Sequence, residues 1–277
     1  MTRQRLSHRL NGLTPDGPFE DIPPHLRHVI GHWFQVATGQ ITNRPLQSAA
    51  MRELAVRFRM NIPADFEVQQ FFRVFDAMLD NEELALDLVD AALDVLGADG
   101  NDWERLQGHL TAGASAWKVA DDHTSLTRVV NEQAQATYDA ATATADEATT
   151  ELQEAWSNAF GRNGDPSDAW DHAIKAVEDV LVAVVVPNKP KATLGDVLGQ
   201  LGSAQSAPLW EMILPGNDQS HDVAPLVAML RLMWPNHDRH GGTAPKRTPS
   251  PEEARAVVTL VATIVQWHRE AWVIRRR

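Results

Sequence analysis

The chain has 277 residues, enough for one large domain or two ordinary ones, and its 43% apolar content gives no sign of overall disorder. It contains no cysteine, which excludes disulfides, thiolate metal ligands and a thiol nucleophile. A net charge of −12 argues against a general nucleic-acid coat, although residues 1–60 and 221–277 are each mildly basic.

The N-terminal stretch MTRQRLSHRLNGLTPDG is basic but has no apolar core, so it does not have the pattern of a signal peptide. The longest apolar run, VLVAVVVP at 180–187, is too short to cross a bilayer. We therefore expect a soluble, cytoplasmic protein that does not act at a membrane.

Residues 1–112 are expected to form a helical N-terminal domain. The stretch DIPPHLRHVIGHWF predicts a helix that begins at proline, and apolar residues recur at helical spacing over 49–59, 66–79 and 82–96. The glycines of GADGNDW end the last of these helices. In the helix expected over 66–79, the apolar stripe consists of Val68, Phe71, Phe72, Phe75, Met78 and Leu79.

The next stretch, 113–130, is the exception to helical periodicity. Its sequence SAWKVADDHTSLTRVV contains two short β-prone pieces, AWKV and LTRVV, on either side of a polar turn. This pattern predicts a small β-hairpin, which we expect to join two helical domains.

Residues 131–277 are again helical in pattern. Small apolar residues step by three or four from Ala134 to Ala159 and predict one helix of almost thirty residues. Two further long helices are expected over 167–186 and 223–234. Shorter helices are expected in TLGDVLGQLG and at 206–213.

Helix starts in this part of the chain have recognisable caps. Asp165 followed by Pro166 is typical of an N-cap with proline in the first turn. Ser250 and Glu253 form a capping-box pattern that predicts the start of the last helix.

The stretch MWPNHDRHGG, between the last two long helices, contains the candidate catalytic residues. Pro235 ends one helix and a Gly-Gly pair frees the backbone, which leaves His237, Arg239 and His240 on a short tether near Arg231. Arginine binds phosphate through a bidentate fork and histidine transfers protons near neutral pH. Together they suffice for cleaving RNA by attack of its own 2′-hydroxyl. The alternative is that the loop cations only interact with the last carbonyls of the preceding helix.

Lys175 and Glu178, on the polar face of the helix over 167–186, could orient the loop side chains. The alternative is that Lys175 forms ordinary exposed ion pairs with Asp171, Glu178 and Asp179, which lie at helical spacing around it. The terminal RRR is most simply a solvated tail, and it could instead extend a phosphate-binding surface.

Metal and cofactor sites have little support in the sequence. His221, His237, Asp238 and His240 could together bind a divalent ion, but they follow no recognised ligand spacing. The helical spacing of the histidines at 25, 28 and 32 indicates a helix face rather than a ligand set. No phosphate-binding glycine loop is present. We therefore expect neither a metal nor a cofactor.

Four segments carry a family resemblance when taken in this order: LQEAWSNAFGRNGDPSDAWDHAIKAVEDV, KATLGDVLGQL, DRHGG and SPEEARAVVTLVATIVQWH. They resemble the C-terminal domain of abortive-infection-like proteins, a member of the HEPN superfamily of four-helix domains. The resemblance covers about 131–270. Residues 1–130 are similar to the helical region that precedes this domain in some actinobacterial members.

The resemblance implies an all-α protein with a HEPN-like four-helix bundle over 131–277. It further implies a metal-independent ribonuclease of an anti-phage or toxin system. Such proteins work as homodimers, in which Arg-x(4–6)-His motifs of both chains meet. RNA is then the expected substrate, and a phage or antitoxin protein is a possible partner.

The family motif is only partly present. His240 with the following glycine matches the family's His-Gly, and Asn236 matches the asparagine of its Arg-Asn pair, but Pro235 stands in place of the arginine. Either Arg231 or Arg239 replaces that arginine, or the domain is inactive and binds RNA, a nucleotide or a protein. Arg231 and His237 have the motif spacing, although two Arg-His pairs near the N-terminus share it. A further hypothesis is that the N-terminal domain acts as a sensor that restrains the C-terminal one.

Overall fold

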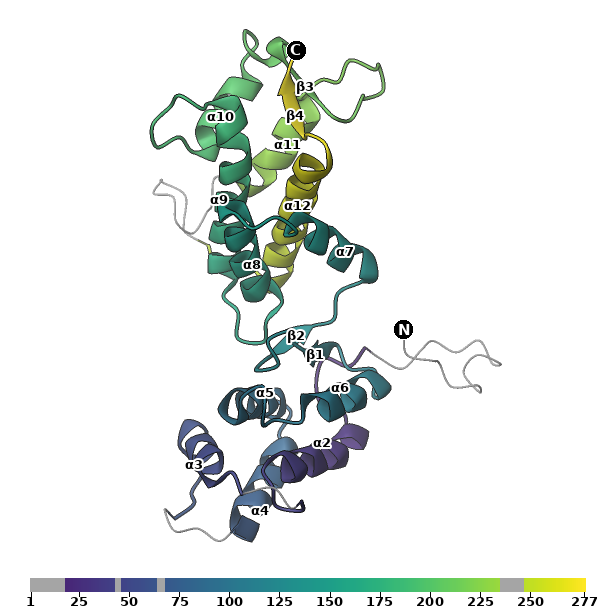
Figure 1. Cartoon of the computed structure of the whole chain (residues 1–277), viewed down its shortest axis with the longest axis vertical. Helices are drawn as coiled ribbons and strands as arrows, with labels where there is room; N and C mark the ends of the chain where they lie inside the picture. The colour runs from purple at the N-terminus through teal and green to yellow at the C-terminus, as the bar shows by residue number, and fades with distance from the viewer. Residues whose placement is uncertain (1–17, 43–45, 64–67, 235–246) are drawn as a thin grey trace, which may run out of the picture. The chain divides into compact units, whose positions relative to one another are not determined.

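The computed structural model describes residues 18–42, 46–63, 68–234 and 247–277 (Figure 1). The chain divides into two compact units, Met1–Val129 and Val130–Arg277, each with its own hydrophobic core. The described residues are mostly helical, as the sequence predicts, with two small antiparallel strand pairs. Over the described ranges, no helix is both long and apolar enough to cross a membrane.

The N-terminal unit consists of five described helices and one hairpin. The helices are α2 (Pro24–Ala37), α3 (Ser48–Arg57), α4 (Val68–Leu79), α5 (Ala85–Leu96) and α6 (Trp103–Ala112). The strands are β1 (Trp117–Val119) and β2 (Leu126–Arg128).

Aromatic side chains from α2 and α4 form the centre of this core. The rings of Phe34 and Phe75 stack with centroids 4.1 Å apart, and Phe71 stacks on both. Phe71, Phe72, Phe75 and Leu79 of the predicted stripe are buried, which confirms the apolar face expected for α4.

The predicted hairpin is present and belongs to the N-terminal unit. β1 and β2 pair antiparallel with Trp117 opposite Arg128, and Trp117, Val119 and Leu126 are part of the N-terminal core. The buried carboxylate of Asp90 on α5 accepts a hydrogen bond from the backbone N–H of Leu126 at 2.6 Å. The division between the units accordingly falls after Val129.

The C-terminal unit consists of six described helices and a two-stranded ribbon. The helices are α7 (Glu132–Ala141), α8 (Glu147–Phe160), α9 (Pro166–Val185), α10 (Leu194–Gly202), α11 (Ala224–Met233) and α12 (Pro251–Glu270). The ribbon pairs β3 (Trp210–Met212) with β4 (Ile274–Arg276).

Three helices, α8, α9 and α12, pack on one another and form the centre of this unit. α7 packs on α12, and α10 packs on both α9 and α11 (Figure 1). The facing side chains are small or branched apolar residues such as Ala155, Val177 and Val261, all fully buried. Small side chains allow the helices to approach closely, as the sequence pattern suggests.

Three local expectations for this unit need correction. The single long helix expected from Ala134 to Ala159 is two helices, because Asp146 caps a new start by accepting from Thr149 N–H at 2.9 Å. The hydroxyl of Thr142 also bonds back to the Tyr138 carbonyl at the end of α7. Residues 206–213 form a short 3-10 turn and strand β3 instead of a helix. The expected solvated tail is partly wrong: the terminal arginines are exposed, but Arg275 and Arg276 belong to strand β4, which pairs with β3.

Candidate functional site

The candidate catalytic segment joins α11 to α12. His237, Arg239 and His240 all lie outside the described residues. So does Asn236, which matches the asparagine of the family motif and is expected to bind or orient the substrate. Of the candidate catalytic residues, Arg231 is described, and so are the candidate orienting residues Lys175 and Glu178. The description of the site therefore starts from these three residues and from the two helix ends that the segment connects.

The end of α11 is fixed by contacts with α9 and α10. The indole N–H of Trp170, on α9, donates to the Met233 carbonyl at 2.9 Å in a buried position. Gly195 on α10 lies so close to Trp234 that a Cβ there would be 3.3 Å from the indole ring. These contacts hold the last turn of α11 in one position relative to two other helices.

The start of α12 is fixed by the predicted capping box. Glu253 N–H donates to the Ser250 hydroxyl at 3.3 Å, and Ser250 N–H donates to the Glu253 carboxylate at 2.9 Å. Arg247 binds the same carboxylate through both guanidinium nitrogens, at 2.7 and 3.0 Å. Both ends of the connecting segment are thus held by specific hydrogen bonds.

Arg231 is exposed in the last turn of α11. Its guanidinium lies beside Gly202 on α10, where an added Cβ would be 3.2 Å from a guanidinium nitrogen. Within the described ranges it has no acidic partner. A cation in the last turn of a helix is also favoured by the helix dipole. The alternative interpretation concerns Arg239 and His240, which lie outside the described residues.

Lys175 and Glu178 have structural partners that explain them without the catalytic segment. Lys175 forms an i,i+4 ion pair with Asp171 at 3.1 Å. Glu178 accepts a hydrogen bond from the backbone N–H of Leu194 at 2.6 Å, which satisfies a donor at the start of α10. Burial raises the pKa of the Glu178 carboxyl, while the Leu194 bond acts in the opposite direction.

The surroundings of Lys175 and Glu178 are acidic. Both line a pocket of about 410 Å³ between α8 and α9, together with Glu147, Glu151 and Asp179. Burial and the nearby carboxylates raise the pKa of Asp179. Four carboxylates against one ammonium disfavour a phosphate, so this surface is poorly suited to hold RNA.

The described histidines do not assemble a metal site. No group of three or more potential ligand side chains occurs in the parts of the chain that the structure describes. The ring of His221 bonds through Nδ1 to the Met212 carbonyl at 2.9 Å. His28 and His32 line a pocket of the N-terminal unit beside Asp76, whose pKa is raised by burial.

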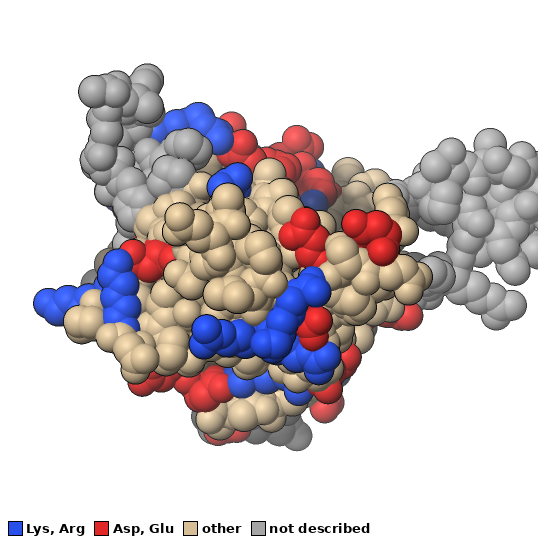
Figure 2. Space-filling view, turned by 90° about the horizontal axis from the view of Figure 1, so that it is seen from above, with Lys and Arg blue, Asp and Glu red and all other residues tan. Residues whose placement is uncertain are grey.

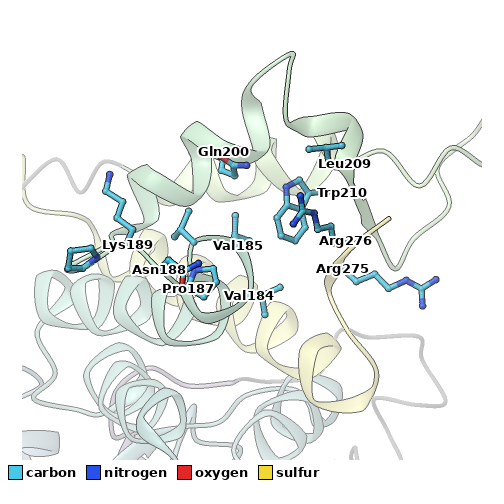
Figure 3. A pocket seen from close by; sticks show the side chains of 12 residues that line it. Val184, Val185, Pro187, Asn188, Lys189, Gln200, Leu209, Trp210, Arg275 and Arg276 are labelled. Carbon is cyan, nitrogen blue, oxygen red and sulfur yellow. The ribbon is translucent and has the colours of Figure 1, made fainter.

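The structure contains a second candidate site that the sequence reasoning missed. An open pocket of about 720 Å³ lies at the C-terminal end of α9, with the β3–β4 ribbon on its other side (Figure 3). The terminal arginines are its one signal in the sequence, since they could extend a phosphate-binding surface. Their position beside α9 depends on a pairing between β3 and β4 that no local pattern indicates.

Comparison of the chain with protein-family models, with curated proteins and with solved structures finds no match in any of the three.

Proposed function

We propose that the C-terminal unit is a HEPN-type ribonuclease that cleaves RNA without a metal, in an anti-phage defence or toxin system. One observation supports this most. The basic segment that carries the candidate residues connects two helix ends, and each end is held by specific hydrogen bonds. Tethering between rigid elements is what a composite catalytic loop needs, because small displacements of the reacting groups lower the rate strongly.

The proposed chemistry uses only side chains of this segment and Arg231 in the last turn of α11. His240 takes the proton from the ribose 2′-hydroxyl, and the 2′-oxygen forms a bond to the adjacent phosphorus. Arg231 or Arg239 neutralises the charge that develops on the phosphate oxygens. The bond to the 5′-oxygen breaks, and His237 supplies a proton to this leaving group. The products are a 2′,3′-cyclic phosphate and a 5′-hydroxyl.

A homodimer through the C-terminal unit forms part of the proposal. One chain offers a single histidine at the position of the family motif, and a second copy would supply a second set of basic residues. The dimer would then place two such segments around one RNA strand. Cytoplasmic action and a phage or antitoxin protein as regulator belong to the same proposal.

A second candidate function is a binding module without catalysis. Pro235 at the position of the family's arginine favours it, and so do the structural partners of Lys175 and Glu178. Such a module would hold RNA, a nucleotide or a protein partner on the same segment. The two functions differ in whether a bound RNA is cut.

The direct test incubates the purified full chain with single-stranded RNA in EDTA. The proposal predicts fragments with 2′,3′-cyclic phosphate ends, and a rate loss of about 100-fold or more in His240→Ala. Arg231→Ala and Arg239→Ala then identify the phosphate-binding arginine. Arg105→Ala, which removes the same charge from an exposed i,i+3 ion pair of the N-terminal unit, is the matched control.

The other outcomes are also informative. RNA that binds without being cut supports the binding module and rejects the ribonuclease. Cutting that persists unchanged in His240→Ala rejects the proposed base. A wild-type chain that neither binds nor cuts RNA contradicts both candidate functions on RNA.

A further inference from the structure

The pocket between α9 and the β3–β4 ribbon has the size and composition of a small-molecule site. Its volume of about 720 Å³ falls within the range usual for such sites. Most of its lining is apolar and includes Val184, Val185, Pro187, Leu209 and Trp210. Figure 3 shows these side chains around a common space.

The pocket is separate from the proposed catalytic segment. That segment precedes the first residue of α12, whereas the arginines of the pocket follow the last residue of α12. The 20 residues of this helix span about 30 Å. A ligand in the pocket would therefore lie far from the start of α12, where the segment ends.

Strand register determines which arginine belongs to the pocket. Trp210 pairs with Arg276 and Glu211 pairs with Arg275, so Trp210 and Arg276 share one face of the ribbon. On the other face, Arg275 binds Glu211 at 2.5 Å and its guanidinium lies over the Trp272 ring. In Figure 3, Arg276 lies beside Trp210 and Arg275 points away.

Two features of the ribbon side would suit a ligand. Trp210 is 6% exposed, and its indole N–H has no acceptor among the described residues, although buried donors are nearly always paired. The neighbouring Leu209 lines the pocket and is 46% exposed, so it offers apolar surface to a ligand there. A ligand with an apolar body and an acceptor group would match both.

The charges around the pocket match one anionic group rather than a polyanion. Lys189 is paired with Asp196, and Arg275 with Glu211, while Arg276 has no acidic partner in the described part of the chain. The C-terminal end of α9 adds partial negative charge from its last carbonyls. Figure 2, seen from above the view of Figure 1, shows basic side chains in separate groups, with acidic side chains beside several of them.

We propose that this pocket binds a small amphipathic anion, a compound with an aromatic or aliphatic body and a single phosphate or carboxylate group. Arg276 binds the anionic group through its guanidinium fork. Val184 and Leu209 contact the apolar body, and the N–H of Trp210 gains an acceptor. This proposal is independent of the ribonuclease activity, because it uses none of the residues assigned to it.

The test follows the indole N–H resonances of the ¹⁵N-labelled full chain. Loss of one resonance in Trp210→Phe assigns the Trp210 signal. The probe is 1-naphthoate, compared with 1-naphthamide, which has a similar shape without charge, and with acetate, which has the charge without the body. We expect 1-naphthoate to shift the Trp210 resonance to saturation, and the other two compounds to bind at least about tenfold more weakly.

Arginine variants make the test specific. Arg276→Ala should weaken 1-naphthoate binding about tenfold and Arg276→Lys should restore part of it. Arg275→Ala, the adjacent residue on the other face, should change Kd by less than about twofold. Unshifted resonances of Trp156 and Trp170, which lie in the core of the C-terminal unit and contact neither arginine, confirm that each variant is folded.

Three results would overturn the proposal. The first is a Trp210 resonance that does not move at millimolar 1-naphthoate. The second is equal weakening by Arg275→Ala and Arg276→Ala, which would indicate a general charge effect. The third is a shift caused by a short single-stranded RNA but not by 1-naphthoate, which would assign the surface to RNA.

Discussion

Arg269 illustrates how one side chain can hold three elements of the C-terminal unit together. From the last turn of α12 its guanidinium binds both carboxylate oxygens of Asp146, at 2.5 and 2.6 Å, and the Ala141 carbonyl at 3.2 Å. These partners are the N-cap of α8 and the last residue of α7. The Arg269 hydrogen bonds are the largest cause that lowers the pKa of Asp146 from its ordinary value of 3.8 to about 2.

We expect Asp146→Asn to reduce the free energy of unfolding at pH 7 by about 1 kcal/mol. The effect is smaller than the pKa shift alone would give, because the carboxylate is 39% exposed and solvent screens the ion pair. The folded-state pKa is depressed, so this contribution is present above about pH 4 and disappears as the pH falls through about 2. Denaturant unfolding at pH 7 and pH 3 should therefore show a smaller wild-type-to-variant difference at pH 3. Glu252→Gln, which removes an exposed i,i+3 partner of Arg255, should cost less than about 0.5 kcal/mol. A difference for Asp146→Asn that grows towards low pH would contradict the assigned cause.

The roles of Lys175 and Glu178 show what the sequence can and cannot predict for single residues. The ion pair between Lys175 and Asp171 follows from helical spacing, as the alternative interpretation predicts. The bond between Glu178 and the N–H of Leu194 joins residues 16 positions apart, on different helices. Its partner is set by the packing of α10 on α9, which no local pattern contains.

Among the elements, α11 matters most for the proposed activity because the catalytic segment follows it. Its last carbonyls would lack partners in a buried helix end, and the Trp170 indole supplies a donor to one of them. Removing that donor leaves the Met233 carbonyl buried and unsatisfied. We expect this to lower the free energy of unfolding by about 1–3 kcal/mol.

Trp170→Phe should accordingly destabilise the C-terminal unit by about 2 kcal/mol and increase amide hydrogen exchange at the end of α11. Trp156→Phe is the matched control. Trp156 is equally buried and stacks on Tyr138 at 4.2 Å, but the described residues offer its indole N–H no acceptor. Equal protection of α11 in the two variants would show that the hydrogen bond does not fix the helix end.

Elements with local signals were predicted well and elements with distant partners were not. Asp165 with Pro166, and Ser250 with Glu253, give the starts of α9 and α12, because an N-cap bonds only to residues in the next turn. The break between α7 and α8 escaped the periodicity analysis, since the apolar stripe continues through it. Strands β3 and β4 escaped it because their pairing joins residues 64 positions apart, such as Glu211 and Arg275.

The whole chain consists of two helical units, each with its own hydrophobic core and with different functional features. The N-terminal part has a core of stacked phenylalanines, whereas the C-terminal part contains the candidate catalytic segment and the pocket. The sequence predicted two helical parts and the hairpin from periodicity. From the sequence, the N-terminal domain is expected to end at 112. No local pattern indicates that Trp117 and Leu126 pack into the N-terminal core.

That division determines how the sensor hypothesis should be tested. A truncation at 112 would leave a hairpin without the core on which it packs, so the shortened chain should begin at Val130. If the N-terminal unit restrains the C-terminal one, residues 130–277 should be more active than the full chain.

The measurement that decides most is growth of cells that express the wild-type chain, His240→Ala, or residues 130–277, with total RNA from each examined on a gel. The account predicts that the wild-type chain or the shortened chain stops growth and fragments RNA, and that His240→Ala does neither. Normal growth and intact RNA with both the wild-type and the shortened chain would contradict the ribonuclease. The binding module would then be the better description of the C-terminal unit.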